Sequence, residues 1–145
     1  MDIDISKLKK YDIEHAKAGD KLILGYLPPY GRTYWTFGTC TIKSVSAKRR
    51  DITLDDRAST RFDKHGRRLG RDRYDKSNEI LLEYDKENIA TVNKYTKHNN
   101  LVRKIGEALE KLAEKRGGLL NEMPTAELEQ FYEMVKRFCG REREI

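Results

Sequence analysis

Residues 17–47 read KAGDKLILGYLPPYGRTYWTFGTCTIKSVSA. Gly19-Asp20 predicts a turn, and the apolar run at 21–26 that follows it predicts a buried strand. The prolines at 28 and 29 remove backbone donors, so residues 27–33 are expected to form a loop. From Tyr34 to Ala47, apolar and polar residues alternate among β-branched and aromatic ones, which predicts a longer strand with one buried face.

Three further strand patterns follow at 51–54, 59–62 and 79–84, and Asp63 to Gly66 has the composition of a tight turn. In the second half, apolar residues recur every three to four positions from Ile89 to Leu112 and from Leu128 to Phe138, a period that predicts helices. The pattern at 89–112 fits either one helix or two with a break at Asn99-Asn100. Strands followed by two or three helices predict an α+β fold with segregated layers.

Five short strands, a Gly-Asp entry, a first loop rich in Pro and Tyr, and tight later turns together resemble a small SH3-like β-barrel over Ala18 to Tyr84. The resemblance implies a five-stranded barrel domain at 1–84 with a short N-terminal lead-in, and a helical tail at 85–145 that packs on it. A small barrel with a charged helical tail is also similar to accessory proteins of bacteriophages, which would work in the host cytoplasm. Small barrels of this type commonly bind nucleic acid or peptides, so the resemblance supports a binding role.

Positive charge is concentrated between Lys48 and Arg73. This stretch holds ten Lys/Arg and five Asp/Glu, a net charge of +5 (10 − 5), whereas the whole chain has a net charge of +6. Such a concentration of guanidinium groups is typical of surfaces that contact phosphates or acidic proteins. The alternative is a solvated hairpin in which the acids of the stretch neutralise its arginines. The candidate contact residues are Arg49, Arg50, Arg61, Arg67, Arg68, Arg71 and Arg73.

Aromatic residues form a second cluster, with five of them within twelve positions from Tyr26 to Phe37. Beside a basic groove such side chains can stack on unpaired bases, and Tyr30 and Trp35 are the candidates for that role. The alternative is that most of these aromatic residues fill the core, because large side chains dominate small cores.

The sequence shows no pattern typical of catalysis or metal binding. His15, His65 and His98 are far apart without further ligands at suitable spacing, and no nucleophile elbow or P-loop is present. We therefore expect no enzyme activity, no metal and no cofactor. Cys40 and Cys139 lack a CxxC spacing, which favours free thiols in a reducing cytoplasm. No segment has the length and apolarity of a membrane span, and no signal peptide is visible, so we expect a cytoplasmic location and no membrane partner.

These patterns favour a non-catalytic nucleic-acid-binding protein that uses the Arg-rich hairpins. We expect weak sequence preference, because phosphate contacts carry no sequence information. A second hypothesis is a phage-type interaction module or inhibitor that docks on an acidic host protein that handles nucleic acid, since Arg and aromatic residues are enriched at such interfaces. The apolar helix stripes are expected to pack on the barrel and on each other, or else to form a dimer seam or a docking face. The sequence leaves open DNA or RNA, single or double strand, and the oligomeric state.

Overall fold

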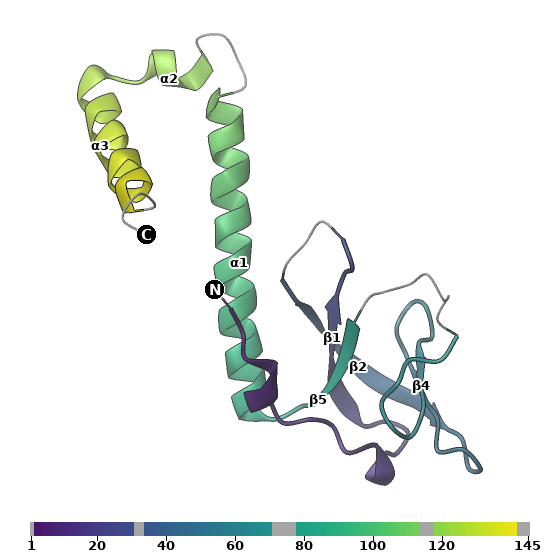
Figure 1. Ribbon diagram of the computed structural model, residues 1–145. Coiled ribbons are helices and arrows are strands. Elements are labelled where there is room, and N and C mark those ends of the chain that lie inside the picture. Colours follow the sequence, from purple (N-terminus) through teal and green to yellow (C-terminus); the bar gives the residue numbers. More distant parts are fainter. Residues whose placement is uncertain (1, 31–33, 71–77, 114–117, 142–145) are drawn as a thin grey trace. The chain divides into compact units, whose positions relative to one another are not determined.

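The structure, a computed structural model, describes residues 2–30, 34–70, 78–113 and 118–141 (Figure 1). Five strands precede three helices, which confirms the predicted α+β class and all five predicted strands. The strands are β1 (Lys21–Leu27), β2 (Thr36–Val45), β3 (Ile52–Leu54), β4 (Arg61–Phe62) and β5 (Asn78–Glu83). The helices are α1 (Lys86–Ala113), α2 (Gly118–Glu122) and α3 (Thr125–Arg141), and two single-turn 3-10 helices, Ile5–Lys7 and Ile13–His15, precede the strands.

The strands form one antiparallel sheet in the order β4-β3-β2-β1-β5. The long strand β2 serves both halves of the sheet: its first part pairs with β1 and its last part with β3, with a register irregularity between Ile42 and Ser44. Irregularities of this kind increase strand twist, and the sheet is curled into a half-barrel (Figure 1). The half-barrel is open, because no strand pairing joins β4 to β5 among the described residues.

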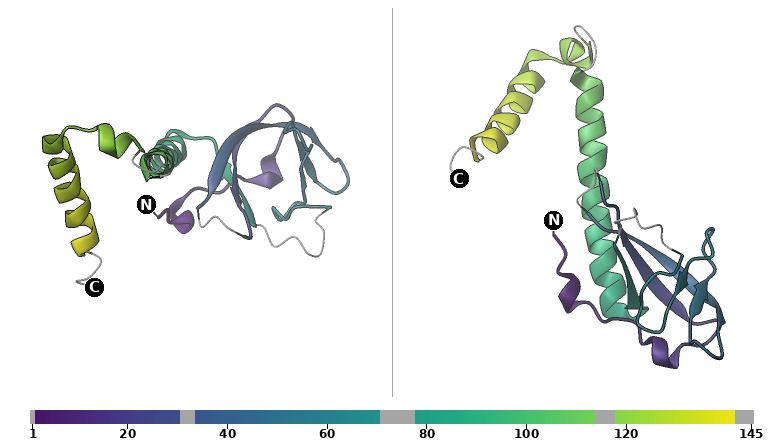
Figure 2. Two further views of the ribbon diagram at one scale, coloured as in Figure 1. Left: turned by 90° about the horizontal axis from the view of Figure 1, so that it is seen from above. Right: turned by 45° about the vertical axis from the view of Figure 1, so that its right-hand side comes forward.

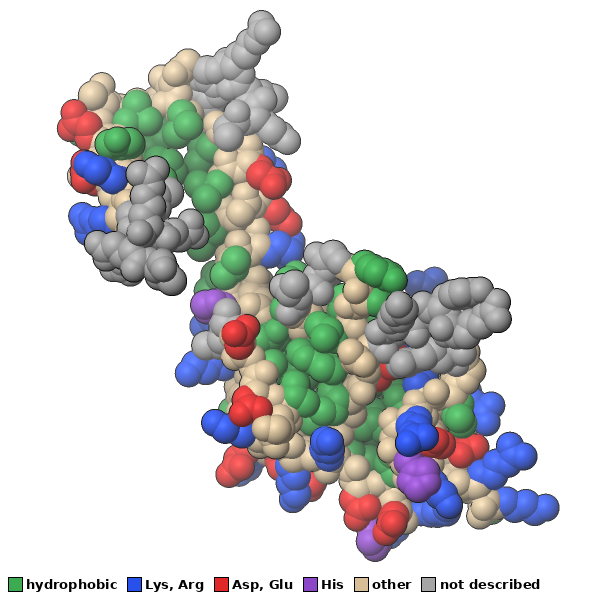
Figure 3. All heavy atoms as spheres, in the orientation of Figure 1, with side chains coloured by type: hydrophobic (Ala, Val, Ile, Leu, Met, Phe, Trp, Pro, Cys, Tyr) green, Lys and Arg blue, Asp and Glu red, His purple; other side chains and the backbone are tan. Residues whose placement is uncertain are grey.

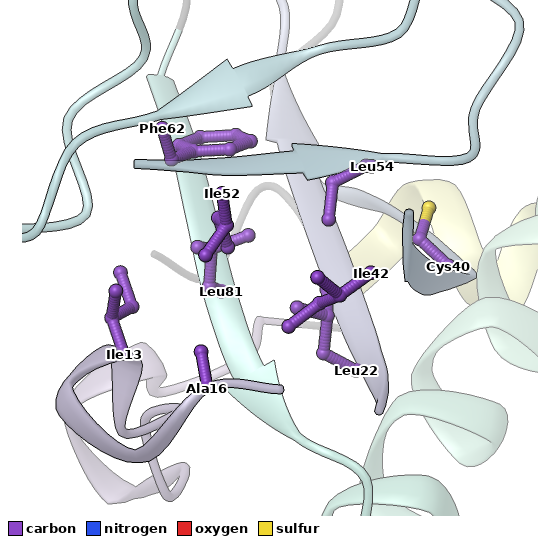
Figure 4. Close-up of a cluster of buried hydrophobic side chains, with 9 residues drawn as sticks. All are labelled: Ile13, Ala16, Leu22, Cys40, Ile42, Ile52, Leu54, Phe62 and Leu81. Atoms are coloured by element: carbon purple, nitrogen blue, oxygen red, sulfur yellow. The ribbon is translucent and has the colours of Figure 1, made fainter. Parts of the chain in front are cut away.

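The main core fills the inside of the curled sheet (Figure 4). Phe62 of the two-residue strand β4 is fully buried there, and the 3-10 helix that contains Ile13 closes the cluster from below the strands. This core consists of Ile13, Ala16, Leu22, Cys40, Ile42, Ile52, Leu54, Phe62 and Leu81.

A second apolar cluster lies on the outer face of β1 and β5. Ile23 and Leu82 pack there against Leu8 of the N-terminal segment and Val92 of α1. Strand β1 is therefore buried on both faces, with Leu22 at 0% and Ile23 at 3% exposure. This explains why its sequence is a continuous apolar run and not an alternating one.

Asn88 joins three segments at the start of α1. Its side-chain amide donates to the carbonyl oxygens of Lys9 (2.8 Å) and Glu83 (2.9 Å), and its Oδ1 accepts from the backbone N–H of Lys9 at 3.2 Å. The backbone N–H of Asn88 donates to the Asp85 carboxylate at 2.7 Å, so Asp85 caps the helix. Asn88 is 3% exposed, so these polar groups have little access to water.

Replacing Asn88 by alanine is therefore expected to lower the free energy of unfolding by about 3 kcal/mol, because three hydrogen bonds to the backbone of Lys9 and Glu83 are lost in a buried position. Urea denaturation measures the change. Exposed Lys97 on the same helix provides the control, since Lys97→Ala should change the stability by less than about 0.5 kcal/mol. Equal effects of the two substitutions would show that Asn88 does not join the segments.

The helix at 89–112, which the sequence left as one or two, is the single helix α1 (Figure 2). The molecule divides into two compact units, 1–99 and 100–145, so the boundary falls inside α1. The first half of α1 belongs to the strand unit, because Val92 and Tyr95 are buried there. We call residues 1–99 the strand unit and 100–145 the helical unit. No helix in the described ranges is long and apolar enough to cross a membrane.

Candidate nucleic-acid interface

Two turns leave the sheet at the same end of β2, β3 and β4. Residues 46–51 connect β2 to β3, and residues 63–67 follow β4. The register pairs Val45 with Ile52 and Ile52 with Phe62, so both turns begin from the same level of the sheet. Neighbouring strands lie about 4.8 Å apart, and β3 separates β2 from β4, so the turns are about 10 Å apart.

The first turn is held by backbone hydrogen bonds. The N–H of Arg50 donates to the carbonyl of Ser46 at 2.9 Å, and the N–H of Ser46 donates to the carbonyl of Asp51 at 2.8 Å. Arg50 has a left-handed backbone (φ 58°), and its guanidinium donates to the carbonyl of Glu14 at 2.6 Å. Arg50 therefore anchors the turn to the N-terminal segment, whereas the preceding Lys48 and Arg49 are exposed.

The second turn is built around Asp63. Its carboxylate accepts the backbone N–H groups of His65 at 2.8 Å and Arg67 at 2.9 Å, and Gly66 supplies the positive φ of 79° that the turn needs. The N–H of Arg67, followed by that of His65, holds the pKa of the Asp63 carboxyl below its ordinary value. Lys64 and Arg67 point out of this turn and are exposed.

The acids of the basic stretch bind backbone groups more than arginines. Asp55 accepts the N–H of Thr41 at 2.8 Å, and Asp56 accepts the N–H of Thr60 at 2.7 Å and also its hydroxyl. Asp63 is occupied in its turn. Only buried Asp51, among the described acids of the stretch, lies near an arginine, 3.6 Å from Arg61. Ion pairing with the described acids of the stretch itself thus accounts for one arginine, Arg61.

The predicted arginines fall into two groups. Arg50, Arg61 and Arg68 are engaged inside the molecule; the guanidinium of Arg68 lies 2.8 Å from the carboxylate of Glu79, whose side chain is 5% exposed. Arg49 and Arg67 are exposed and make no side-chain hydrogen bond or ion pair within the described residues. Arg71 and Arg73 lie outside the described residues. Figure 3 shows Lys and Arg side chains projecting on the side of the strand unit where Figure 1 labels β4.

The predicted aromatic residues lie at the other end of β2. Trp35 precedes this ten-residue strand and the first basic turn follows it, so about 30 Å of strand separates them. The Trp35 ring stacks on Phe37 with centroids 6.2 Å apart, and its backbone N–H donates to the Tyr95 hydroxyl at 3.0 Å. Trp35 is half-buried, whereas Tyr30 is 74% exposed. The structure therefore does not bring Tyr30 and Trp35 together with the basic turns.

A groove of about 350 Å³ runs between the second turn and the N-terminal segment. Lys10, Tyr11 and Asp12 line one side, and Lys64 and His65 line the other. Sequence reasoning did not name Lys10, Lys64 or His65 as contact residues. Lys64 and His65 could have been included because they belong to the basic stretch, but no sequence signal brings Lys10 beside residues more than fifty positions away.

Among the described residues, no group of three or more His, Cys, Asp or Glu side chains could hold a metal ion. Burial, followed by the charges of Asp56 and Asp55, raises the pKa of the Cys40 thiol, so this cysteine is a poor nucleophile at neutral pH. Exposed basic groups on two neighbouring turns are suited to binding anions.

Comparison with known proteins identifies no family for this chain. No protein-family model matches the chain, and no curated protein or solved structure is significantly similar to it.

Proposed function

We propose that this protein binds nucleic acid non-catalytically through the two turns at the end of β2, β3 and β4. The contact residues are Lys48, Arg49, Lys64 and Arg67, which we call the paired-turn surface. Arg50, Arg61 and Arg68 support it by fixing the turns and the strand beside them. At a separation of about 10 Å, the two turns would span about three base pairs at 3.4 Å each.

The observation that carries this proposal is that the acidic side chains of the basic stretch hydrogen-bond mainly to backbone groups. Asp55, Asp56 and Asp63 accept backbone N–H groups and hold the local structure, and none of them forms an ion pair with an exposed basic side chain of the described residues. The backbone N–H of Arg67 contributes most to lowering the pKa of the Asp63 carboxyl, and the Arg67 side chain adds to this only through its charge. The paired-turn surface therefore presents four basic groups without a side-chain partner among the described residues. Such groups gain affinity for a polyanion by releasing its counterions.

The composition around these turns favours nucleic acid over an acidic protein. Protein interfaces are usually centred on buried aromatic or aliphatic anchors surrounded by a polar rim. None of the large hydrophobic side chains that are exposed in the described part of the strand unit lies between 48 and 70; they are Tyr26, Tyr30 and Tyr84. A surface of exposed cations without an apolar centre fits phosphates better.

We also propose that the strand unit is an SH3-like barrel that has remained open. The strand order and the sharing of β2 between the two halves of the sheet support this assignment. Binding then follows from the turns that this scaffold presents and not from the scaffold itself.

A salt series tests the proposal. Four phosphate contacts predict that the logarithm of the binding constant falls with the logarithm of salt concentration with a slope of about −3.6 for duplex DNA and about −2.8 for a single strand. Affinity for duplex DNA should therefore drop about a hundredfold between 50 and 200 mM salt. Fluorescence anisotropy with labelled single- and double-stranded DNA and RNA measures both quantities.

Lack of binding to every nucleic acid at 50 mM salt would overturn the proposal. The acidic-protein hypothesis would then replace it. A stoichiometric protein partner that is retained on the immobilised chain after nuclease treatment would support that hypothesis.

A further inference from the structure

The helical unit has an apolar face but no buried core. Its described side chains, 100–112, 120–137, include none that is buried. Seven of the ten large hydrophobic side chains that are exposed in the described molecule belong to it, and Figure 3 shows hydrophobic side chains in a row along this part of α1. They are Leu101, Val102, Ile105, Leu109, Tyr132, Met134 and Val135. Helices in proteins gain most of their stability from packing an amphipathic face, so this unit needs further burial.

The apolar residues of α1 follow a heptad. Val102, Ile105, Leu109 and Leu112 are spaced by three, four and three residues, as at the a and d positions of a coiled coil. The e and g positions between 101 and 112 carry Leu101, Gly106 and Ala108, none of them charged. Every charged side chain of this segment is at b, c or f: Arg103, Lys104, Glu107, Glu110 and Lys111.

Helix α3 repeats this design. Leu128, Phe131, Val135 and Phe138 have the same spacing, with Tyr132 at e and Met134 at g. The charged side chains between 128 and 138 again occupy only b, c and f. A face that includes a, d, e and g is wider than the a/d seam that one neighbouring helix covers, and it is typical of helices in a bundle. Each helix therefore needs two helical neighbours, and one chain supplies only one long neighbour for each.

We propose that the missing neighbours come from a second copy of this chain, and that two helical units form an antiparallel four-helix bundle. The α1 stripe is self-complementary about a two-fold axis near Glu107. In an antiparallel pair, Val102 meets Leu112 and Ile105 meets Leu109 of the other copy, so each a residue meets a d residue. Next to the axis, Gly106 and Ala108 each face the same residue of the other copy. These small uncharged residues allow close approach and bring no like charges together.

Charge at the flanks supports a second copy over an unrelated partner. An acidic or basic partner would be recognised by charges at the e and g positions beside the seam, and 101–112 has none there. The charged b, c and f positions carry three basic and two acidic residues on 101–112, so this face stays solvated in the bundle.

Sedimentation equilibrium of the full chain tests the proposal. The wild-type protein should be a dimer at micromolar concentration, and Ile105→Lys with Leu109→Lys should raise the dimer dissociation constant at least about a hundredfold. Glu107→Ala, on the solvent face of the same helix, is the matched control and should leave dimerisation unchanged. A wild-type protein that stays monomeric at about 100 μM would overturn the proposal, as would a lysine variant that dimerises as well as wild type.

Thiol cross-linking tests the geometry without depending on the stability of a charged variant. In a Cys139→Ser background, Ala108→Cys should cross-link two chains efficiently with a short bis-maleimide, because the two copies of this residue lie beside the axis. Leu101→Cys should not cross-link, because its two copies would be about 20 Å apart at 1.5 Å per residue. The opposite pattern, or equal yields, would overturn the antiparallel bundle.

Discussion

Replacing both Arg49 and Arg67 by glutamate is expected to weaken nucleic-acid binding about a hundredfold at 100 mM salt, while the protein stays folded. Neither arginine forms a side-chain hydrogen bond or ion pair among the described residues, so each guanidinium can contact a ligand. The charge of Arg67 also acts on the Asp63 carboxyl of its own turn. Loss of about 1.4 kcal/mol per residue, close to the lower end of the range for a hydrogen bond to a charged group, gives this factor. The slope of the salt series should also become shallower by about 2, because two phosphate contacts disappear. Anisotropy titrations at several salt concentrations measure both changes.

The control is a variant with the same change in net charge at another surface. Lys94→Glu with Lys97→Glu places two acidic residues on exposed positions of α1. This control should retain most of the affinity and the full salt slope. If both double variants weaken binding equally, the binding responds to net charge alone and the paired-turn surface is not the site. Unchanged affinity of the Arg49 and Arg67 variant would also show that the paired-turn surface is not the site.

Replacing Phe62 by alanine is expected to lower the free energy of unfolding by about 3–5 kcal/mol, the usual range for a buried phenylalanine. Phe62 is fully buried in the core of the curled sheet and pairs with Ile52 across β4 and β3 (Figure 4). Strand β4 has only two residues, and Phe62 is the one whose side chain is buried in the core at the base of the second basic turn. Because domains of this size have total stabilities of about 5–15 kcal/mol, this variant should be close to unfolding at 37 °C.

Urea denaturation followed by tryptophan fluorescence measures this loss. Phe62→Leu keeps most of the buried volume and should cost less than about 1.5 kcal/mol. Tyr30→Ala, at an exposed aromatic residue of the same unit, should change the stability by less than about 0.5 kcal/mol. A loss below about 1 kcal/mol for Phe62→Ala would show that Phe62 does not fill the core as the structure indicates.

Local sequence patterns predicted the elements of this fold well. The five strands were visible from apolar runs, alternation and turn residues, and the structure confirms all five. The unbroken apolar run at 22–24 already indicates that β1 is buried on both faces. The residues that cover its outer face, Leu8 and Val92, come from distant parts of the chain. The continuity of α1 through Asn99-Asn100 was not predictable, because the stripe has the same period on both sides of these residues.

The sequence predicted the region that forms the basic surface, but not which of its side chains are exposed. Composition identified the region between Lys48 and Arg73, but it could not separate Arg49 from Arg50, which are adjacent in sequence. Arg50 donates to a carbonyl 36 positions away, whereas Arg49 remains exposed. The same holds for Asp55, whose partner is the N–H of Thr41 and not a neighbouring arginine.

The sequence by itself determined the helical and strand periods, the concentration of positive charge, and the heptad of the helices, because these depend on residues close together in the chain. Tertiary structure alone decided which basic side chains are free, that the two basic turns lie side by side, and that Trp35 is a full strand length away from them. These features depend on strand register and on partners distant in sequence. The carboxylates of the basic stretch accept hydrogen bonds from backbone N–H groups, whereas composition alone would have paired them with arginines. No local sequence pattern specifies which of these partners a carboxylate takes.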